Sequence, residues 1–400
     1  MWGDSVRSVL ACCRAPRARE GRAMKNARHR LPTGLLETLS ARREAEDPGM
    51  LTMPEPAASG QRRGAFKPSD RLTGLLLGCA IGDALGMPVE GVENDEILRA
   101  IHRLGGIRDY LAPQPHVLRS LRRLRPGCWT DDTQLTLAIT RSLVRERGVD
   151  HDAVASAHVH AFENFELRGW DATTKQSCRR LAQGTPRTRS GKLGGAANAV
   201  AAKIAPIAAV SHLRGEDRAS LLDHCCAVSV MTHHDPRSAV GAYLVGLLVQ
   251  DALDAPRRWE PEADRYESLM EEAAWAESEL AGTIGTTDEP ISQHLSELSD
   301  ALDSDADELA ELSHGATHHA WASIPFIIAL LASRPWEFEG GVLATVNAGG
   351  DTDTNGAIVG SILGAACGAR RIPRRFVDKL EEAEMIRELG HEFAVSVDFS

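Results

Sequence analysis

Apolar residues recur at helical spacing along most of the chain, whereas the alternation typical of half-buried strands is scarce. In the segment 71–85, leucines and glycines together favour a helix packed closely against its neighbours. Another helix should begin at Thr130 or Asp131, since both residue types are good N-caps. An exposed acidic loop with a helical piece is expected at 283–307. We predict an all-α fold, with further helices at about 151–166, 173–182, 196–203, 217–230, 237–253, 261–281, 308–334, 339–348, 354–368 and 374–389.

Residues 1–66 differ in composition from the rest of the chain, because arginine is frequent there. We interpret them as a poorly ordered, basic N-terminal extension, or as the product of a start codon placed upstream of the true one at Met24, Met50 or Met53. A basic arm that docks an acidic partner and an organellar transit peptide are the alternatives. The folded domain is expected to occupy residues 67–400.

The formal net charge of −11 argues against nucleic acid as a main partner, since phosphate binding requires a basic face. The longest apolar stretches are 239–249, 324–332 and 356–369, all shorter than the roughly 20 residues that span a bilayer. The N-terminus lacks the apolar core of a secretory signal. The cysteines form no C-x-x-C pair, which favours a reducing compartment. We expect a soluble, cytoplasmic protein that is not bound to a membrane.

A glycine pair, Gly349 and Gly350, directly precedes Asp351, Asp353 and Thr354 at the start of a predicted helix. The pair lets the backbone bend sharply and approach a ligand closely. Ligand sets made only of oxygen suit Mg²⁺ or Mn²⁺ rather than zinc. This stretch is therefore the first candidate for a metal site.

A second oxygen-rich group, Thr130, Asp131 and Asp132, also opens a helix. Each group alone is better explained by helix capping, for which one side chain is enough. Adjacent carboxylates repel one another, however, unless positive charge lies beside them. We predict that the two groups meet in space and hold two divalent cations, which can orient vicinal hydroxyls and lower the pKa of bound water.

Glu90 follows a glycine-rich segment that contains Asp83 and Pro88. Pro88 cannot continue the preceding helix, so Glu90 is predicted to lie in a loop. A lone loop carboxylate is more often simply solvated, but in this context Glu90 is the best candidate for a mobile general acid or base. Asp83 is predicted to cap or pin the loop.

Asp171, Asn198 and His233 are weaker candidates, for contact with a substrate. Asp171 precedes a helix and is equally well explained as a cap, Asn198 carries little signal by itself, and His233 at a helix boundary could donate to a phosphate. His314 and His318 are four residues apart, as on one helical face. We interpret them as structural or solvated, because no third ligand has matching spacing.

Three segments together resemble the ADP-ribosylglycohydrolase family, which includes the ADP-ribosylarginine hydrolases. They are Gly-Cys-Ala-Ile-Gly-Asp-Ala-Leu-Gly at 78–86 followed by Glu90, Trp-Thr-Asp-Asp at 129–132, and Gly-Gly-Asp-Thr-Asp-Thr-Asn-Gly-Ala-Ile at 349–358. The similarity covers about residues 67–399. It implies a compact domain of orthogonal helices around a dinuclear Mg²⁺ or Mn²⁺ centre. The ligands that the resemblance implies are Thr130, Asp131, Asp132, Asp351, Asp353 and Thr354.

The resemblance also implies the reaction, in which water cleaves the bond at C1″ that links ADP-ribose to a modified side chain, arginine being favoured over serine. Glu90 or Asp131 would activate the water or assist the leaving group, and Asp353 would bridge or orient the metals. Asp171 matches the aspartate that arginine-directed members place near the scissile bond. The remaining substrate contacts it implies are Asn198, His233, Gly349 and Gly350.

Two departures from the family pattern leave the substrate open. Alanine stands at 197 and 199, where many members have glycine, and the glycine expected two residues after Asp171 is absent. The alternatives are serine-linked or small-molecule ADP-ribose conjugates, or a phosphohydrolase acting on related nucleotides. An immunity-type protein that binds an ADP-ribosylating toxin or target protein through residues 1–66 is a non-enzymatic alternative.

Overall fold

The computed structural model describes residues 68–91, 105–113 and 121–397. The chain divides into two units, residues 1–63 and 64–400, and every described residue belongs to the second. The predictions made for residues 1–66, namely poor order and a basic arm, therefore lie outside the described residues.

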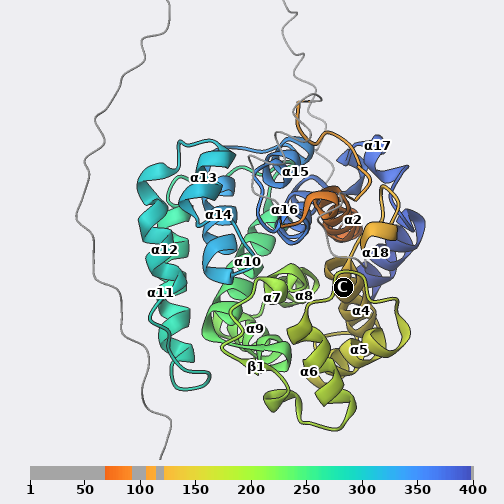
Figure 1. Cartoon of the computed structure of the whole chain (residues 1–400), viewed down its shortest axis with the longest axis vertical. Helices are drawn as coiled ribbons and strands as arrows, with labels where there is room; N and C mark the ends of the chain where they lie inside the picture. Colours follow the sequence, from red (N-terminus) through yellow and green to blue (C-terminus); the bar gives the residue numbers. More distant parts are fainter. Residues whose placement is uncertain (1–67, 92–104, 114–120, 398–400) are drawn as a thin grey trace, which may run out of the picture. The chain divides into compact units, whose positions relative to one another are not determined.

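Helices make up nearly all the regular structure of the described residues (Figure 1), which confirms the predicted all-α class. The first half of the folded unit contains α2 (Pro68–Gly86), α4 (Asp131–Glu146), α5 (His151–Asn164), α6 (Ala172–Ala182), α7 (Ala199–Ala202), α8 (Ala205–Leu213) and α9 (Arg218–Thr232). The second half contains α10 (Pro236–Asp254), α11 (Arg265–Leu280), α12 (Ile291–Leu298), α13 (Ala306–Leu312), α14 (Ala320–Ser333), α15 (Phe338–Asn347), α16 (Thr352–Cys367), α17 (Arg374–Val377) and α18 (Ala383–Val397). Two-residue strands, β1 (Lys192–Leu193) and β2 (His233–His234), pair in parallel.

Helices α2 and α16 lie backbone to backbone at the core, and every residue of α16 is buried. Glycines recur every four residues on the facing sides: Gly74, Gly78 and Gly82 on α2, and Gly364, Gly360 and Gly356 on α16. A Cβ atom on Gly78 would lie only 2.0 Å from the carbonyl oxygen of Gly360. The two helices run antiparallel, so the end of α2 that leads to Glu90 lies beside the start of α16.

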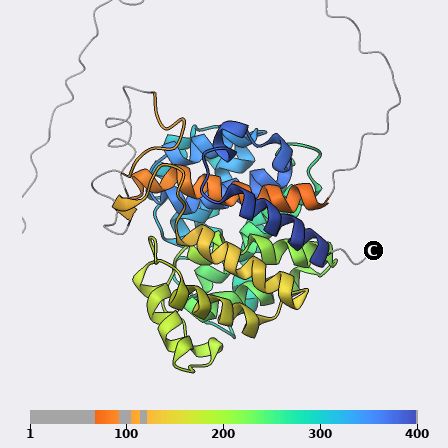
Figure 2. The ribbon, with the colours of Figure 1, turned by 90° about the vertical axis from the view of Figure 1, so that its right-hand side faces the viewer.

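Helix α18 runs alongside α2, and α4 packs against both (Figure 2). Gly390 of α18 permits this approach, since a Cβ atom there would lie 2.6 Å from the hydroxyl of Thr73. The arrangement places the first turn of α4 next to the C-terminal half of α2. Both oxygen-rich groups thus begin helices that meet the same end of α2.

The segment Pro68–Val89 is long and apolar enough to cross a membrane, judged by length and composition alone. Its most apolar window is entirely buried within the described fold, where it forms the core helix. The expectation that no stretch reaches this length was wrong here. The prediction compared only the stretches 239–249, 324–332 and 356–369, and it left out this segment, in which Asp83 and other polar residues stand among the apolar ones.

Two of the predicted helices are each broken in the structure. Residues 308–334 do not form one helix, because α13 ends at Leu312 and α14 begins at Ala320. Between them His314, Gly315 and Ala316 have φ angles of 56°, 80° and 48°, in the left-handed region that a right-handed helix excludes. Similarly, residues 374–389 divide into α17 and the start of α18 around Glu382, whose φ is 54°.

Helix α8 was not predicted, because Ala205-Pro206 reads as a boundary. Pro206 instead stands in the first turn, where its missing N–H is not needed. The helical piece expected within the acidic segment 283–307 is confirmed as α12, followed by a 3₁₀ turn at Ser299–Ala301.

Candidate metal centre and active site

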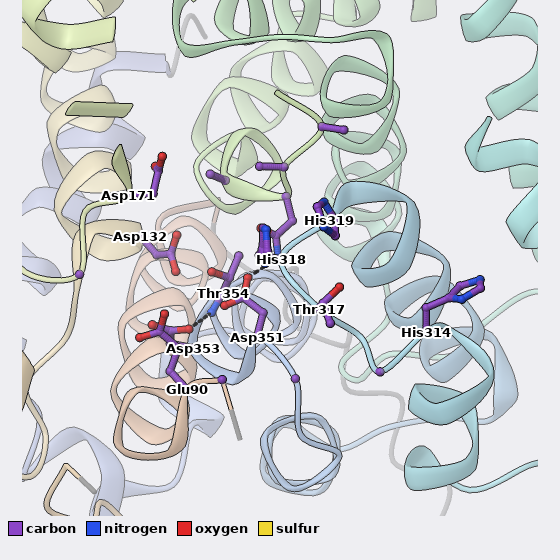
Figure 3. A pocket seen from close by; sticks show the side chains of 18 of the residues that line it. Glu90, Asp132, Asp171, His314, Thr317, His318, His319, Asp351, Asp353 and Thr354 are labelled. Carbon is purple, nitrogen blue, oxygen red and sulfur yellow. Dashed lines mark hydrogen bonds between the residues drawn. The ribbon is translucent and has the colours of Figure 1, made fainter. Parts of the chain in front are cut away.

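The two oxygen-rich groups line one cavity of about 1640 Å³. Figure 3 shows the labelled acidic side chains from α4, from α16 and from the loop after α2 gathered on one side of it. This side is lined by Glu90, Asp131, Asp132, Asp351, Asp353 and Thr354. The prediction that the groups meet in space therefore agrees with the structure.

The loop before α16 is held in place by contacts with the loop between α13 and α14. Gly349 and Gly350 have φ angles of 87° and 76°, which favour glycine. A Cβ atom on Gly350 would lie 2.2 Å from the carbonyl oxygen of Gly315. The backbone N–H of Asp351 donates to the carbonyl oxygen of Ala316 at 3.1 Å. The loop between α13 and α14 thus fixes the position of the Asp351 backbone at the wall of the cavity.

Glu90, Asp351 and Asp353 each place a carboxylate oxygen within 4.8 Å of the others. Glu90 lies just beyond a 3₁₀ turn at Met87–Val89, so its predicted loop position is confirmed. Burial, together with the charges of Asp351, Asp131 and Asp83, raises the pKa of Glu90 to about 8. Burial, then the charges of Glu90 and Asp351, also raises the pKa of Asp353 well above its ordinary value. Carboxylates this close and this buried require protons or a cation.

Asp83 holds the first turn of α4 from outside that helix. Its carboxylate accepts hydrogen bonds from the N–H of Thr130 at 2.9 Å, and from the N–H and Oγ1 of Thr133 at 3.1 and 2.6 Å. Asp83 was predicted to cap or pin the loop that leads to Glu90, whereas in the structure its carboxylate caps the start of α4. Thr130 makes no side-chain cap of its own, and its Oγ1 is buried without a hydrogen-bond partner. Thr130 is fully buried, and the residues that line the cavity do not include it, so its role as a ligand stays a prediction.

Asp131 and Asp132 also carry pKa values raised well above the ordinary value. For Asp131 the causes are burial and then the charges of Asp132 and Asp171. For Asp132 they are burial and then the charges of Asp83 and Asp351. The cluster thus holds several buried carboxylates and an unsatisfied hydroxyl, and the donors that we assign to it are all oxygens. This is the donor set that hard divalent cations prefer, so the residues present fit a Mg²⁺ or Mn²⁺ site.

Asp171 and Asn198 each make a contact that explains their position. The Oδ1 of Asp171 accepts from the N–H groups of Thr173 and Thr174 at 2.5 and 3.0 Å, so Asp171 caps α6 while lining the cavity. The side-chain amide of Asn198 donates to Oδ2 of Asp351 at 2.7 Å. In the structure Asn198 thus contacts Asp351, which is a predicted metal ligand.

His233 lies in the cavity wall and is 1% exposed. Its Nδ1 is 3.0 Å from the hydroxyl of Thr232. Burial, then the charge of Lys203, lowers the pKa of His233 to about 4, so the imidazole is neutral near pH 7. The strand pairing of β1 and β2 sets His233 opposite Lys192, which lines the same cavity.

A family model described as ADP-ribosylglycohydrolase matches residues 66–398. The chain belongs to this family. The family is one of hydrolases, and the chain is accordingly an enzyme of that class.

Curated relatives of this ADP-ribosylglycohydrolase align over most of its length. ADP-ribosylhydrolase ARH3 of Bos taurus is 26% identical, over 80% of this chain and 91% of the relative. ADP-ribosyl-[dinitrogen reductase] glycohydrolase of Rhodospirillum rubrum is 26% identical, over 80% and 94%. ADP-ribosylarginine hydrolase Tri1 of Serratia proteamaculans is 23% identical, over 81% and 78%.

A solved structure described as an ADP-ribosylglycohydrolase-related protein complex is similar in fold, with a TM-score of 0.60 and 24% identity. The alignment covers 83% of this chain and 99% of that one. At this identity the likeness establishes the fold of the family domain.

The walls of the ADP-ribosylglycohydrolase cavity carry opposite charges that sequence reasoning missed. Lys175 and Lys192 line one part, and acidic residues of and before α13 line another: Asp305, Asp307, Glu308 and Glu311. The signal for Lys192 was the Gly-Gly that follows it at 194–195, typical of a backbone that approaches a ligand. The acidic residues carried no such signal, because Asp305 and Asp307 were expected in an exposed acidic loop and Glu308 and Glu311 in the helix that follows it.

Proposed function

We propose that this enzyme hydrolyses the glycosidic bond that links ADP-ribose to a modified side chain of a protein, with arginine favoured over serine. The observation that carries the proposal is the carboxylate cluster formed by α4, α16 and Glu90 at one side of a cavity large enough for a nucleotide sugar. The names of two relatives, one acting on ADP-ribosyl-[dinitrogen reductase] and one on ADP-ribosylarginine, support this substrate class.

We further propose two divalent cations, Mg²⁺ or Mn²⁺, as cofactors. When bound, such ions supply orientation of the ribose hydroxyls and stabilisation of developing charge. The unsatisfied Oγ1 of Thr130 and the raised carboxylate pKa values support this assignment. The proposed ligands are Thr130, Asp131, Asp132, Asp351, Asp353 and Thr354.

We assign the proton transfer and the substrate contacts to residues of this chain. Glu90 or Asp131 holds or accepts the proton that moves between water and the leaving group, and burial raises the pKa of Glu90 above its ordinary value. Asp171 uses Oδ1 as a helix cap, which leaves Oδ2 for a guanidinium leaving group. His233, beside Lys192, is positioned to donate to the diphosphate.

The cellular location and the binding partners are also part of the proposal. A cytoplasmic location is supported by the free, buried thiols of the described cysteines. An ADP-ribosylated protein is the proposed partner. Binding of a toxin or target protein by residues 1–66 is supported by the sequence alone, since those residues lie outside the described part of the chain.

The test is release of ADP-ribose from ADP-ribosyl-arginine with Mg²⁺, with Mn²⁺ and with EDTA. We expect release with either ion and none with EDTA. Release from a serine-linked conjugate, but not from the arginine conjugate, would replace the linkage while keeping the reaction. No release from either conjugate would overturn the proposal.

A further inference from the structure

A second and chemically different group of metal-ligating side chains lies beside the cavity. His294 and Glu297 stand one turn apart on α12, and His314 follows α13. One ligand atom from each lies within 4.8 Å of the other two. His314 also lines the cavity, on the side away from Glu90 and Asp132 (Figure 3). The group is therefore separate from the acidic cluster.

His294 independently indicates a missing ligand. The residue is 9% exposed, and both of its ring nitrogens are buried without a hydrogen-bond partner. Leaving both nitrogens of a buried imidazole unsatisfied is costly.

The spacing of His294 and Glu297 fits coordination better than a direct ion pair. Nδ1 of His294 lies 3.4 Å from Oε2 of Glu297, which is long for a hydrogen bond to a carboxylate. Two ligand atoms bound tetrahedrally at about 2.0–2.1 Å lie roughly 3.3 Å apart. An ion between the two side chains would therefore require little movement.

We propose that His294, Glu297 and His314 bind one borderline transition-metal ion, Zn²⁺ above all, with water as the remaining ligand. Two imidazoles and one carboxylate form a donor set that zinc uses in proteins. The oxygen-only cluster at the other side of the cavity suits Mg²⁺ or Mn²⁺ instead. The enzyme thus has two sites of different metal preference on one cavity.

Aromatic packing holds the two imidazoles in place. Trp321, at the start of α14, stacks on His294 with ring centroids 5.3 Å apart and meets His314 edge-on at 5.1 Å. Contacts of this kind fix ring orientation, as the outer shell of a metal site does.

The zinc site would connect α12 to the loop that braces the acidic cluster. His314 precedes Ala316 by two residues, and the carbonyl oxygen of Ala316 accepts from the N–H of Asp351 at 3.1 Å and from the side-chain amide of Asn355 at 2.8 Å. An ion held by His314 restrains this loop and, through it, the position of Asp351. Its role is therefore structural support of the active site, not chemistry.

The experiment uses the untagged full chain, stripped by a chelator and then given Co²⁺ in excess Mg²⁺, which occupies the oxygen cluster. Tetrahedral Co²⁺ with imidazole ligands absorbs visible light strongly, whereas octahedral Co²⁺ with oxygen ligands absorbs weakly. We expect one strongly absorbing Co²⁺ per chain, displaced by Zn²⁺. Because ADP-ribose release is not the readout, the result is independent of the proposed function.

Variants locate the ion. Glu297→Gln and His314→Ala change exposed side chains, and each should weaken Co²⁺ binding at least about 10-fold, since even outer-shell partners of metals cost that much. His160→Ala, an exposed histidine on α5, is the matched control and should bind as the unaltered chain does. Absence of the absorbing species in the unaltered chain would overturn the proposal. So would equal binding by all three variants.

Discussion

Asn198 donates its side-chain amide to Oδ2 of Asp351 at 2.7 Å, across 153 positions of sequence. Asn198 is 2% exposed, and the same amide also lies 3.2 Å from the hydroxyl of Ser323. The bond fixes one oxygen of Asp351, a residue that lines the cavity. Asn198 therefore orients a proposed metal ligand from behind.

Replacing Asn198 by alanine should weaken Mn²⁺ binding by about 10- to 100-fold, because outer-shell partners orient the ligands that they contact. Titration calorimetry with Mn²⁺ measures this directly. Asn164→Ala is the control, since Asn164 lies exposed on α5 and bonds only within that helix. Unchanged Mn²⁺ affinity in Asn198→Ala would show that Asp351 does not depend on this contact or does not bind the ion.

Asp353→Asn should slow turnover by at least about 100-fold, because a bound ion supplies several kcal/mol of transition-state stabilisation. The same substitution should leave the stability of the metal-free protein unchanged or raise it. Since burial raises the pKa of Asp353, the ionised carboxylate destabilises the metal-free protein, and asparagine removes that cost. We expect a melting temperature of the metal-free variant equal to or above that of the unaltered chain.

The same reasoning holds for Asp131→Asn, whose pKa is also raised. Asp378→Asn changes an exposed carboxylate that does not line the cavity and should affect neither quantity. Near-normal turnover in Asp353→Asn or Asp131→Asn would contradict the assignment of these residues to the metal centre.

The stabilisation that Mg²⁺ gives to the folded state should grow with pH. The folded-state pKa of Glu90 is raised from 4.5 to about 8, so its favourable contribution is complete below about pH 4.5 and is lost as pH rises through about 8. Bound cations compensate the ionised carboxylates, and protons compete with them at low pH. The rise in melting temperature on adding Mg²⁺ should be larger at about pH 8 than at about pH 5.

Glu90→Gln should reduce this difference between the two pH values, because one of the titrating carboxylates is gone. A Mg²⁺ effect that is equal at both pH values, or larger in acid, would show that the carboxylates are not the groups that bind the ion.

Gly78→Ala should lower the free energy of unfolding by about 1–3 kcal/mol or more, as an overpacked core does. Its Cβ would lie 2.0 Å from the carbonyl oxygen of Gly360, so α2 and α16 would have to separate. Gly282→Ala is the control, because a Cβ there meets no atom within 4 Å. Denaturant unfolding of both variants compares them, and equal stability would contradict the close contact of the two helices.

Local signals could be predicted from the sequence where one residue decides the backbone. Pro88 ends α2 and puts Glu90 in a loop, and the glycine pair before Asp351 predicts the sharp bend. Both oxygen-rich groups were identifiable because adjacent carboxylates repel one another unless a proton or a cation lies beside them. The glycines of α2 predicted close packing against an unspecified neighbour.

Long-range partners could not be predicted, because no single segment carries them. The four-residue glycine spacing occurs in both α2 and α16, but nothing in the sequence of either helix shows that the other is its packing partner. His314 and His318 read as one helical face, which is wrong, since the left-handed φ of His314 and Gly315 ends α13. The partners of His314, on α12, lie 17 or more positions earlier and shared no visible motif.

We propose that this enzyme cleaves a glycosidic bond at its carboxylate cluster. The most direct measurement is mass spectrometry of a peptide carrying ADP-ribosyl-arginine, incubated with the enzyme and Mg²⁺. We expect a peptide with unmodified arginine together with intact ADP-ribose, and neither product with Asp353→Asn. A peptide that keeps ribose phosphate while AMP is released would show cleavage of the diphosphate and would contradict the account.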